Sequence, residues 1–411
     1  MFRILTLLNL FFLTALSTAA DLSVSLSGIA PRVSSSHPAL KAARLAVEEA
    51  RGRQRAAGRL ANPTAGMDYQ NQSKVSPSAL GFSIDQAFPV TRRLAVEKKL
   101  SAQLLAAAEL EVREAERRMI AEAQSLAVQI LAVHEKRSLG GKQGQLASEL
   151  SGFAREKATS GEISPLEATQ ARVDAQRLRV ETLKWENESV SLVGMLKPML
   201  GLAPTDQLTL TGGLPAVSVP RGTANLNQRP DLVLAQTKVA AAETDVDLAM
   251  ERKWQDLTAG IFAAHEEQLV SPSNTEHTGF AGFRLSIPLP LWNQNQGEIA
   301  EKAASAERAR LEREALAQTI QSEAETARKE MLAQAEVIRE TRDELLPLLA
   351  DQAAELERAY GSGQTDLLTV LRAGEQRLQL EASALDAVRD FHLARIRYEA
   401  ATAQHAPAPP P

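Results

Sequence analysis

The sequence predicts a mainly helical protein with a small membrane-crossing β part, in which a helix-strand-strand-helix-helix unit is duplicated. Three observations support this fold class. Apolar residues recur at spacings of three and four over very long stretches, which is the pattern of amphipathic helices. Short segments between them alternate apolar and polar residues, as half-exposed strands do. Several motifs of the first half recur in the same order in the second half, which indicates a repeat.

The stretch GFRLSIPLPLWNQNQGEI at 282–299 shows the alternation most clearly. Its apolar positions are Phe283, Leu285, Ile287, Leu289 and Leu291, with Arg284, Ser286, Pro288 and Pro290 between them. A period of two predicts an extended strand with one apolar face. The chain has four such strand candidates, at 63–71, 80–90, 255–266 and 279–291. Each has roughly the nine to eleven residues, or slightly more, that a tilted strand needs to cross a bilayer.

The repeat is visible as four matches in one order. HPALKAARLAVEEA at 37–50 matches RPDLVLAQTKVAAA at 229–242. Three short motifs follow: Thr64-Ala65-Gly66 with Thr258-Ala259-Gly260, Gly81-Phe82 with Gly282-Phe283, and Ser160-Gly161 with Ser362-Gly363. We therefore predict a first structural repeat at 21–202 and a second at 228–402. The linker at 203–227, rich in Pro, Gly and Thr, is expected to contain one short strand.

The N-terminus predicts export. Arg3 precedes an apolar run at 4–16 and the small residues 17–20, so residues 1–20 are interpreted as a signal peptide. No later segment reaches the roughly 20 apolar residues of a membrane-spanning helix. The C-terminal residues 403–411, rich in proline, are predicted to be disordered.

Composition excludes several functional classes. Hydrophobic residues make up 44% and aromatics only 4%, which predicts a thin, extended core. The formal charge of -5 is spread over interleaved charges, so no basic stripe is present and no nucleic acid is expected as a partner. The chain has no cysteine, which removes disulfides, thiolate chemistry and lipidation on cysteine.

Two very long helices are predicted, at about 92–159 and 297–360, the first followed by a second helix that ends near 200. Glycines 140, 141 and 144 and Pro347 fall inside these helices. Because glycine and proline weaken or kink helices, we expect a change of direction or packing at these places, with a tolerated local bend as the alternative.

Lipid is the predicted contact of the apolar strand face. Four strands cannot close a barrel, and open strand edges cannot persist in hydrocarbon, so several chains are expected to share one barrel. The predicted lipid-facing residues are Phe283, Leu285, Ile287 and Leu289. Trp254 and Trp292, next to the second hairpin, are predicted to lie in the membrane girdle of aromatic side chains. The alternative is an ordinary half-buried hairpin that rests on the helices.

Over essentially the whole mature chain the sequence resembles the TolC-type outer-membrane factors. The resemblance rests on IPLPLWNQNQGEIA after a strand, LLP at 345–347, AYGSGQTDLLTVLRAGEQRL at 359–378 and ATSGEISPLEATQARVDAQRL in the first half. Within this family, the segment PLPLWNQNQGEIA is most similar to the cobalt-zinc-cadmium resistance branch. The resemblance implies a homotrimer with a 12-stranded outer-membrane β-barrel and an α-barrel tunnel of twelve helices through the periplasm. It also implies two partners, a periplasmic adaptor (membrane fusion) protein and an inner-membrane pump of the resistance-nodulation-division type.

The residues near the two helical turns become rings in such an assembly, and a ring of carboxylates favours cations. The candidate channel-tip residues are Glu162, Glu167, Tyr360, Thr365, Asp366 and Arg372. Glu167 fits the acidic site that the resemblance implies in the first half, whereas Thr369 and Arg372 occupy the corresponding second-half sites. We predict that Glu167 and Asp366 supply most of the negative charge, with Arg372 as a partner in the closed state. Exposed charges on a solvated turn are the alternative.

The same turns, TSGEIS and GSGQTD, present small residues in which an adaptor hairpin can nest. Gly161 and Gly363 are the predicted docking positions.

No catalytic constellation is found, so an enzyme is not expected. The six histidines, His37, His134, His265, His277, His392 and His405, are scattered, with no pair at helical ligand spacing. His265-Glu266-Glu267 and Glu276-His277 are placed on a surface loop, where we expect solvated charges, with a transition-metal site as the alternative. Neither a metal nor a cofactor is predicted.

The predicted function is therefore an outer-membrane exit duct of a tripartite efflux system, which passively conducts substrates, heavy-metal cations first among them. The alternatives are a multidrug or type I secretion duct of the same family, and a periplasmic coiled-coil adaptor without a barrel.

Overall fold

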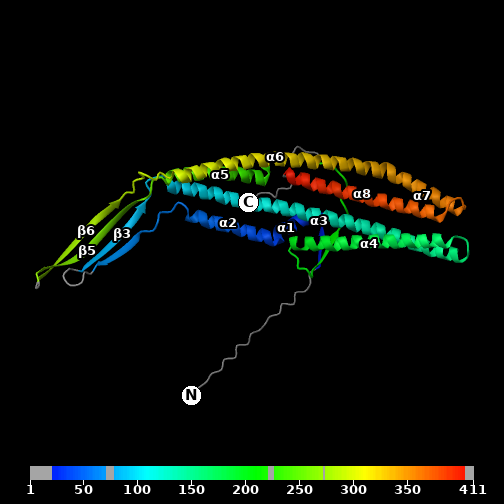
Figure 1. Ribbon diagram of the computed structural model, residues 1–411, viewed down its shortest axis with the longest axis horizontal. Helices are drawn as coiled ribbons and strands as arrows, with labels where there is room; N and C mark the ends of the chain where they lie inside the picture. Colours follow the sequence, from blue (N-terminus) through cyan, green and yellow to red (C-terminus); the bar gives the residue numbers. More distant parts are fainter. Residues whose placement is uncertain (1–20, 71–77, 221–225, 272–273, 403–411) are drawn as a thin grey trace, which may run out of the picture. The chain divides into compact units, whose positions relative to one another are not determined.

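The computed structural model describes residues 21–70, 78–220, 226–271 and 274–402 (Figure 1). The predicted signal peptide and C-terminal tail lie outside these residues. The chain forms two compact units. The first, here called the turn unit, comprises Met1–Pro38, Met119–Pro220 and Arg328–Ile396. The second, here called the sheet unit, comprises Ala39–Arg118, Arg221–Ala327 and Arg397–Pro411.

The fold is mainly helical, as predicted, and the order helix-strand-strand-helix-helix occurs twice along the chain. The helices are α1 (Leu26–Ser36), α2 (Pro38–Ala56), α3 (Arg93–Thr159), α4 (Pro165–Met199), α5 (Pro230–Glu251), α6 (Gln296–Glu340), α7 (Leu346–Gly361) and α8 (Leu367–Ala401). A π-helical turn at Thr341–Leu345 joins α6 to α7, and a 3-10 turn at Leu226–Gln228 precedes α5. The strands are β1 (Asp21–Ser25), β2 (Thr64–Gln70), β3 (Ala79–Phe88), β4 (Gln207–Thr211), β5 (Leu257–Ser271) and β6 (Asn274–Ser286).

The sheet unit contains one four-stranded antiparallel sheet in the order β2-β3-β5-β6. It lies at one end of the helices of that unit (Figure 1). Strands β2 and β6 are the two outer strands, and each pairs with one neighbour. In the turn unit, β1 pairs in parallel with β4, and β4 is the short strand expected in the linker.

The second hairpin differs from the prediction at both ends. Strand β5 continues to Ser271 and β6 begins at Asn274, so residues 265–267 and 276–277 belong to paired strands and not to a surface loop. At the other end β6 stops at Ser286, whereas the alternation predicted a strand to 291. Pro288 and Pro290 explain the early end, because proline has no N–H to donate to a neighbouring strand.

The glycines and the proline predicted to lie inside the long helices differ in their effect on helix geometry. Helix α3 runs over 67 residues, about 100 Å, and passes through glycines 140, 141 and 144 without interruption. The helix therefore has no break at these glycines, and the change of direction or packing expected there takes the form of a close contact between Gly140 and α4. In the second half, the π-helical turn ends just before α7, which has Pro347 in its first turn, so the irregularity expected at this proline is present.

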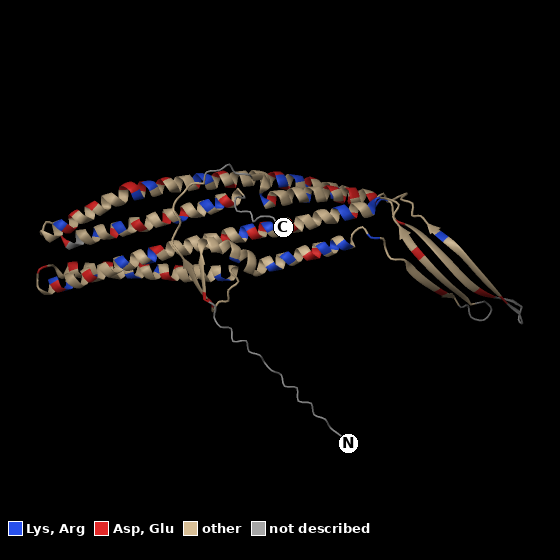
Figure 2. Ribbon diagram, turned by 180° about the vertical axis from the view of Figure 1, so that it is seen from behind, with Lys and Arg blue, Asp and Glu red and all other residues tan. Residues whose placement is uncertain are grey.

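Small and β-branched side chains fill the helix seams. In the turn unit, α3 buries Ala123, Ala127, Val128, Ile130, Leu131 and Ala132 over three helical turns, and Phe391 of α8 is fully buried. In the sheet unit, Arg229 is buried and paired with Asp231 at 2.8 Å and with Glu323 of α6 at 3.0 Å, which fixes the start of α5 against α6. Charged side chains are spread along the helices and are sparse on the sheet (Figure 2). No helix in the described ranges is both long and apolar enough to span a bilayer.

Candidate functional site in the sheet face and the helical turns

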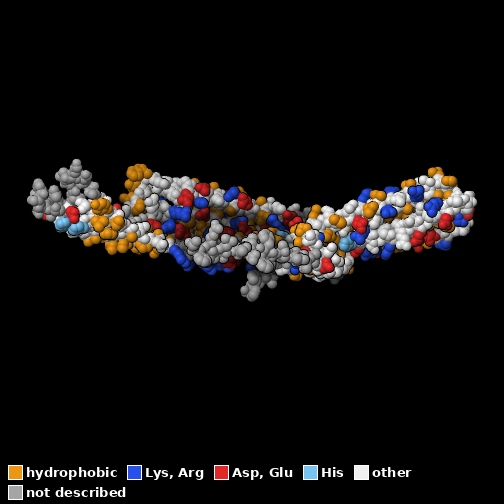
Figure 3. Space-filling view, turned by 90° about the horizontal axis from the view of Figure 1, so that it is seen from below, with side chains coloured by type: hydrophobic (Ala, Val, Ile, Leu, Met, Phe, Trp, Pro, Cys, Tyr) orange, Lys and Arg blue, Asp and Glu red, His pale blue; other side chains and the backbone are white. Residues whose placement is uncertain are grey.

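One face of the four-stranded sheet is apolar and exposed. The strand register places Met67, Phe82, Ala263 and Ala281 side by side, and Ala65, Ile84, Ile261 and Phe283 in the next row. Phe283 is 86% exposed, Met67 67% and Ile261 64%. Hydrophobic side chains therefore gather over the sheet (Figure 3). A contiguous exposed apolar patch of this kind marks a contact with a membrane or another protein.

The opposite face of the sheet carries polar and small residues together with Phe262 and Phe280. A Cβ on Gly260 would lie 2.0 Å from Asp85 Oδ1, and a Cβ on Gly282 would lie 2.8 Å from the Phe262 ring. The guanidinium of Arg284 lies 5.6 Å from the centroid of the same ring. The two glycines therefore leave room for the side chains of neighbouring strands, and this face carries the charged residues Asp85 and Arg284 opposite the Ile84, Ile261 and Phe283 row of the first face.

The other residues predicted to contact the membrane lie outside the strands. Ile287 and Leu289 follow β6, so their predicted position in a strand is wrong, although both side chains are exposed. Trp254 lies between α5 and β5 and is 43% exposed, and Trp292 lies between β6 and α6 and is 90% exposed. Both tryptophans thus stand at helix-to-sheet connections, where the sequence placed them.

The motif WNQNQGEI forms the connection from β6 to α6. Asn295 has a φ of 63°, in the left-handed region, and its backbone N–H donates to Asn293 Oδ1 at 3.0 Å. Its side-chain amide donates to the carbonyl of Ala249 at 2.9 Å and to Glu298 at 2.6 Å. The amide of Asn295 and the guanidinium of Arg252 hold the pKa of Glu298 below its usual range. These hydrogen bonds fasten the start of α6 to the end of α5.

The two helical turns have the same geometry. Gly161 and Gly363 have φ values of 79° and 73°, which favour glycine. After α3 the N–H of Glu162 donates to the carbonyl of Lys157 at 2.9 Å, and after α7 the N–H of Gln364 donates to that of Ala359 at 2.8 Å. The N–H of Gly161 also donates to the carbonyl of Ala158 at 3.2 Å, and that of Gly363 to the carbonyl of Tyr360 at 3.0 Å. This pair of bonds is a Schellman motif in both halves. A Cβ on either glycine would meet open space, so both turns present an accessible backbone.

Near these turns, the helical hairpin of α3 and α4 packs against the helical hairpin of α7 and α8 within the turn unit. Ala154 of α3 and Ala171 of α4 are buried together. Tyr360 of α7 and Leu371 of α8 pack against them, and both turns lie at the same end of the unit (Figure 1). Tyr360, predicted as a channel-tip residue, therefore contributes to packing between the hairpins.

The predicted acidic tip residues lie in different electrostatic surroundings. Glu162 is exposed and pairs with Lys157 and with the hydroxyl of Ser160, and these two donors lower its pKa. Asp366 accepts the backbone N–H of Thr369 at 2.7 Å, which caps α8. The pKa of Asp366 is lowered by the donors of Thr369 and by the positive charge of Arg372.

Glu167 and Thr365 are half-buried, Glu167 in the first turn of α4, and Arg372 is exposed. Lys157 was not predicted as a tip residue. It lies five residues before Glu162 and pairs with it across the turn.

The histidines are less scattered in space than along the chain. His265 and His277 stack with Glu267 beside them, on β5 and β6. No helical spacing relates these residues, because a cross-strand pair depends on the hairpin register. His134 and His392 lie in helices and bond to Ser189 and to the carbonyl of Pro215, respectively. His405 lies outside the described residues.

Several solved outer-membrane channels share the fold of this chain, which is the fold that the TolC-type resemblance implies. The channel CusC superimposes with a TM-score of 0.76 and 17% identity, over 94% of this chain and 95% of CusC. The CmeC outer-membrane channel of Campylobacter jejuni gives a TM-score of 0.76 and 14% identity, over 92% of this chain and 85% of CmeC. The outer-membrane protein VceC of Vibrio cholerae gives 0.74 and 17%, over 92% and 95%.

The cobalt-zinc-cadmium resistance protein CzcC of Cupriavidus metallidurans is 24% identical over 285 residues. The aligned part is 66% of this chain and 60% of CzcC, so the chain matches somewhat less than two thirds of that relative. No protein-family model matches the chain.

Proposed function

We propose that the protein is the outer-membrane exit duct of a tripartite efflux system. Three copies complete a 12-stranded barrel and an α-barrel tunnel, which receive substrate from a periplasmic adaptor and an inner-membrane pump. The observation that carries the proposal is the sheet, whose exposed apolar face ends in two outer strands with one neighbour each. In hydrocarbon every backbone amide must be paired, and four strands are too few to close on themselves. Neighbouring copies therefore supply the missing strand partners.

In this assembly the apolar face contacts lipid and the polar face lines the lumen. Phe283, Leu285 and Ile261 face the acyl chains, and Trp254 and Trp292 lie at the headgroup level on the periplasmic side. Arg284 and Asp85 face the aqueous interior, which suits passive conduction of hydrated solutes. The protein is not an enzyme in this proposal, and it takes its energy from the inner-membrane pump.

Heavy-metal cations are the proposed cargo. The support is the sequence similarity to CzcC, a cobalt-zinc-cadmium resistance protein. Growth of a deletion strain on cobalt, zinc, cadmium and a panel of drugs tests it, with the wild-type gene restored on a plasmid as control. We expect the deletion to lower the tolerated metal concentration and the plasmid to restore it. Sensitivity to drugs alone would reassign the duct to multidrug efflux.

The duct itself is tested separately from the cargo. The mature protein is expected in the outer-membrane fraction and, after reconstitution, to give single-channel currents in a planar bilayer. Recovery entirely in the soluble periplasmic fraction would favour the coiled-coil adaptor instead.

A further inference from the structure

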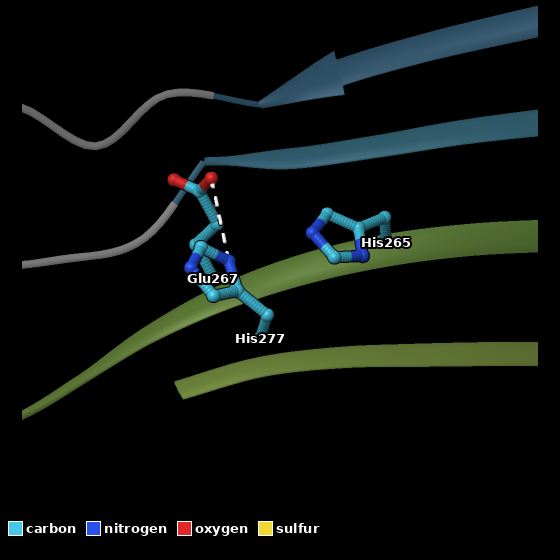
Figure 4. A group of neighbouring side chains, drawn as sticks. All are labelled: His265, Glu267 and His277. Atoms are coloured by element: carbon cyan, nitrogen blue, oxygen red, sulfur yellow. Dashed lines mark ion pairs between the residues drawn. The ribbon is translucent and has the colours of Figure 1, made fainter. Parts of the chain in front are cut away.

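His265, Glu267 and His277 project from one face of the sheet, beside its apolar side chains (Figures 3 and 4). His265 and Glu267 are alternate residues of β5, so they point to the same side. His277 of β6 is the direct partner of Glu267 in the register. By the same register Ile261 and Phe283 also belong to this face.

The three side chains are close enough to hold one metal ion. Each offers a nitrogen or oxygen atom within 4.8 Å of the others. The Nδ1 of His277 lies 3.6 Å from Glu267 Oε1, and the rings of His265 and His277 stack with centroids 5.6 Å apart. Two ligands on a tetrahedral zinc ion, with bonds of about 2.0–2.1 Å, lie about 3.4 Å apart. The Glu267–His277 pair thus already has about the required spacing, and a ligand nitrogen of His265 lies within 4.8 Å of both.

Glu267 is also held in position by Ser78, the residue before β3. The hydroxyl of Ser78 donates to Glu267 Oε2 at 2.9 Å, and the backbone N–H of Glu267 donates to the carbonyl of Ser78 at 3.0 Å. A hydrogen bond to the second oxygen of a carboxylate is the usual way in which a metal ligand is oriented. Here it occupies Oε2 and leaves Oε1 facing His277.

We propose that His265, Glu267 and His277 bind one divalent transition-metal ion of the zinc class, with water in the remaining coordination positions. Two imidazoles and one carboxylate suit zinc, copper and nickel, whereas magnesium and calcium require about six or more oxygen ligands. The ion connects β5 to β6 near the end of their pairing. Because the site shares a face with the apolar patch, it lies outside the lumen of the proposed duct and is independent of the cargo.

The test measures metal binding to the full chain, purified in detergent and stripped with chelator. Calorimetry with Zn²⁺ is expected to give one site per chain, and Mg²⁺ is expected to give none. His277→Gln and Glu267→Gln should each weaken Zn²⁺ binding by at least about tenfold, and Ser78→Ala by about tenfold. The matched controls are Glu266→Gln and Glu276→Gln, on the same strands but the opposite face, and these should leave the affinity within about twofold.

A second readout needs no variant. Electron paramagnetic resonance of the Cu²⁺-loaded wild-type protein is expected to show coupling to two imidazole nitrogens. The proposal is overturned if Zn²⁺ does not bind, if the controls weaken binding as much as the ligand variants, or if the copper spectrum shows only oxygen ligands.

Discussion

At Gly140 the absence of a side chain determines how closely two helices approach. A Cβ at this position would lie 2.4 Å from the Trp185 ring and 3.0 Å from Thr182 Oγ1, both on α4. Trp185 is buried, so its ring cannot move away without opening the seam between α3 and α4. Gly140, where the sequence predicts a change of direction or packing, is therefore a close contact between α3 and α4.

We predict that Gly140→Ala destabilises the protein. Alanine favours the helix by about 1 kcal/mol, but overpacking against a buried ring costs about 1–3 kcal/mol. Gly141→Ala is the matched control, since its Cβ would meet nothing within 4 Å and only the helix preference remains. Thermal unfolding followed by helical circular dichroism should show a lower melting temperature for the first variant only. Equal shifts in both would rule out the packing explanation.

The carboxylates at the tip are predicted to differ in their effect on conduction. Glu162 already pairs with Lys157, so neutralising it changes the net charge of a compensated pair. Glu167→Gln is expected to lower the preference for cations, because a ring of three charges is lost from the proposed tunnel tip. Glu162→Gln is the control and should change it less. The reversal potential of single channels in a salt gradient measures both, and an unaltered value in Glu167→Gln would retire the role of this residue.

The elements differ in how well the sequence predicts them. Helix periodicity places the ends of α3 within a residue or two, because its amphipathic pattern is long. The end of β6 is missed because side-chain alternation continues through Pro288 and Pro290, whereas the backbone ladder cannot. The sequence offers a transition-metal site at 265–267 and 276–277 only as an alternative on a loop, because which of these residues share a face depends on the pairing of two strands. The sequence therefore predicts patterns within one helix or strand, whereas contacts between strands can be assigned only once their register is known.

At the helical turns, a suitable substitution can test adaptor docking without disturbing the fold of the turn. Alanine at Gly161 or Gly363 would strain the left-handed backbone, and a weaker complex would then have two explanations. Asparagine tolerates this conformation and still adds bulk in open space. We expect Gly161→Asn and Gly363→Asn to reduce co-purification of the adaptor while the amount in the outer membrane stays normal. Undiminished co-purification would place the docking surface elsewhere.

The two faces of the sheet predict opposite responses to a new charge. Phe283→Arg puts a guanidinium on the apolar face, where it costs about 2–4 kcal/mol at the bilayer midplane. Ser286→Arg, three residues along the same strand, adds it to the face that already carries Arg284. The first variant should be depleted from the outer membrane and the second retained, as measured by immunoblotting of fractions. Equal retention would mean that the apolar face does not contact lipid.

At the scale of the whole molecule, the two outer strands β2 and β6 each pair with one neighbour and can pair with each other between copies. The outer strands β2 and β6 run antiparallel to their neighbours, so β2 of one copy can continue the antiparallel order beside β6 of the next. This contact is heterologous, and such contacts form a ring if the rotation closes and a filament if it does not. The proposed duct requires closure, and the TolC-type resemblance implies three copies.

The absence of cysteine makes this closure directly measurable. With Met67→Cys on β2 and Ala281→Cys on β6, a bis-maleimide should link copies into dimers and trimers on a denaturing gel, and no larger species should appear. The control pair Ile84→Cys and Ile261→Cys sits on directly paired strands of one chain, so its cross-link should leave the protein monomeric on the gel. A ladder that continues beyond three would indicate an open filament. Monomers alone from the β2–β6 pair in intact outer membranes would contradict a barrel shared between copies.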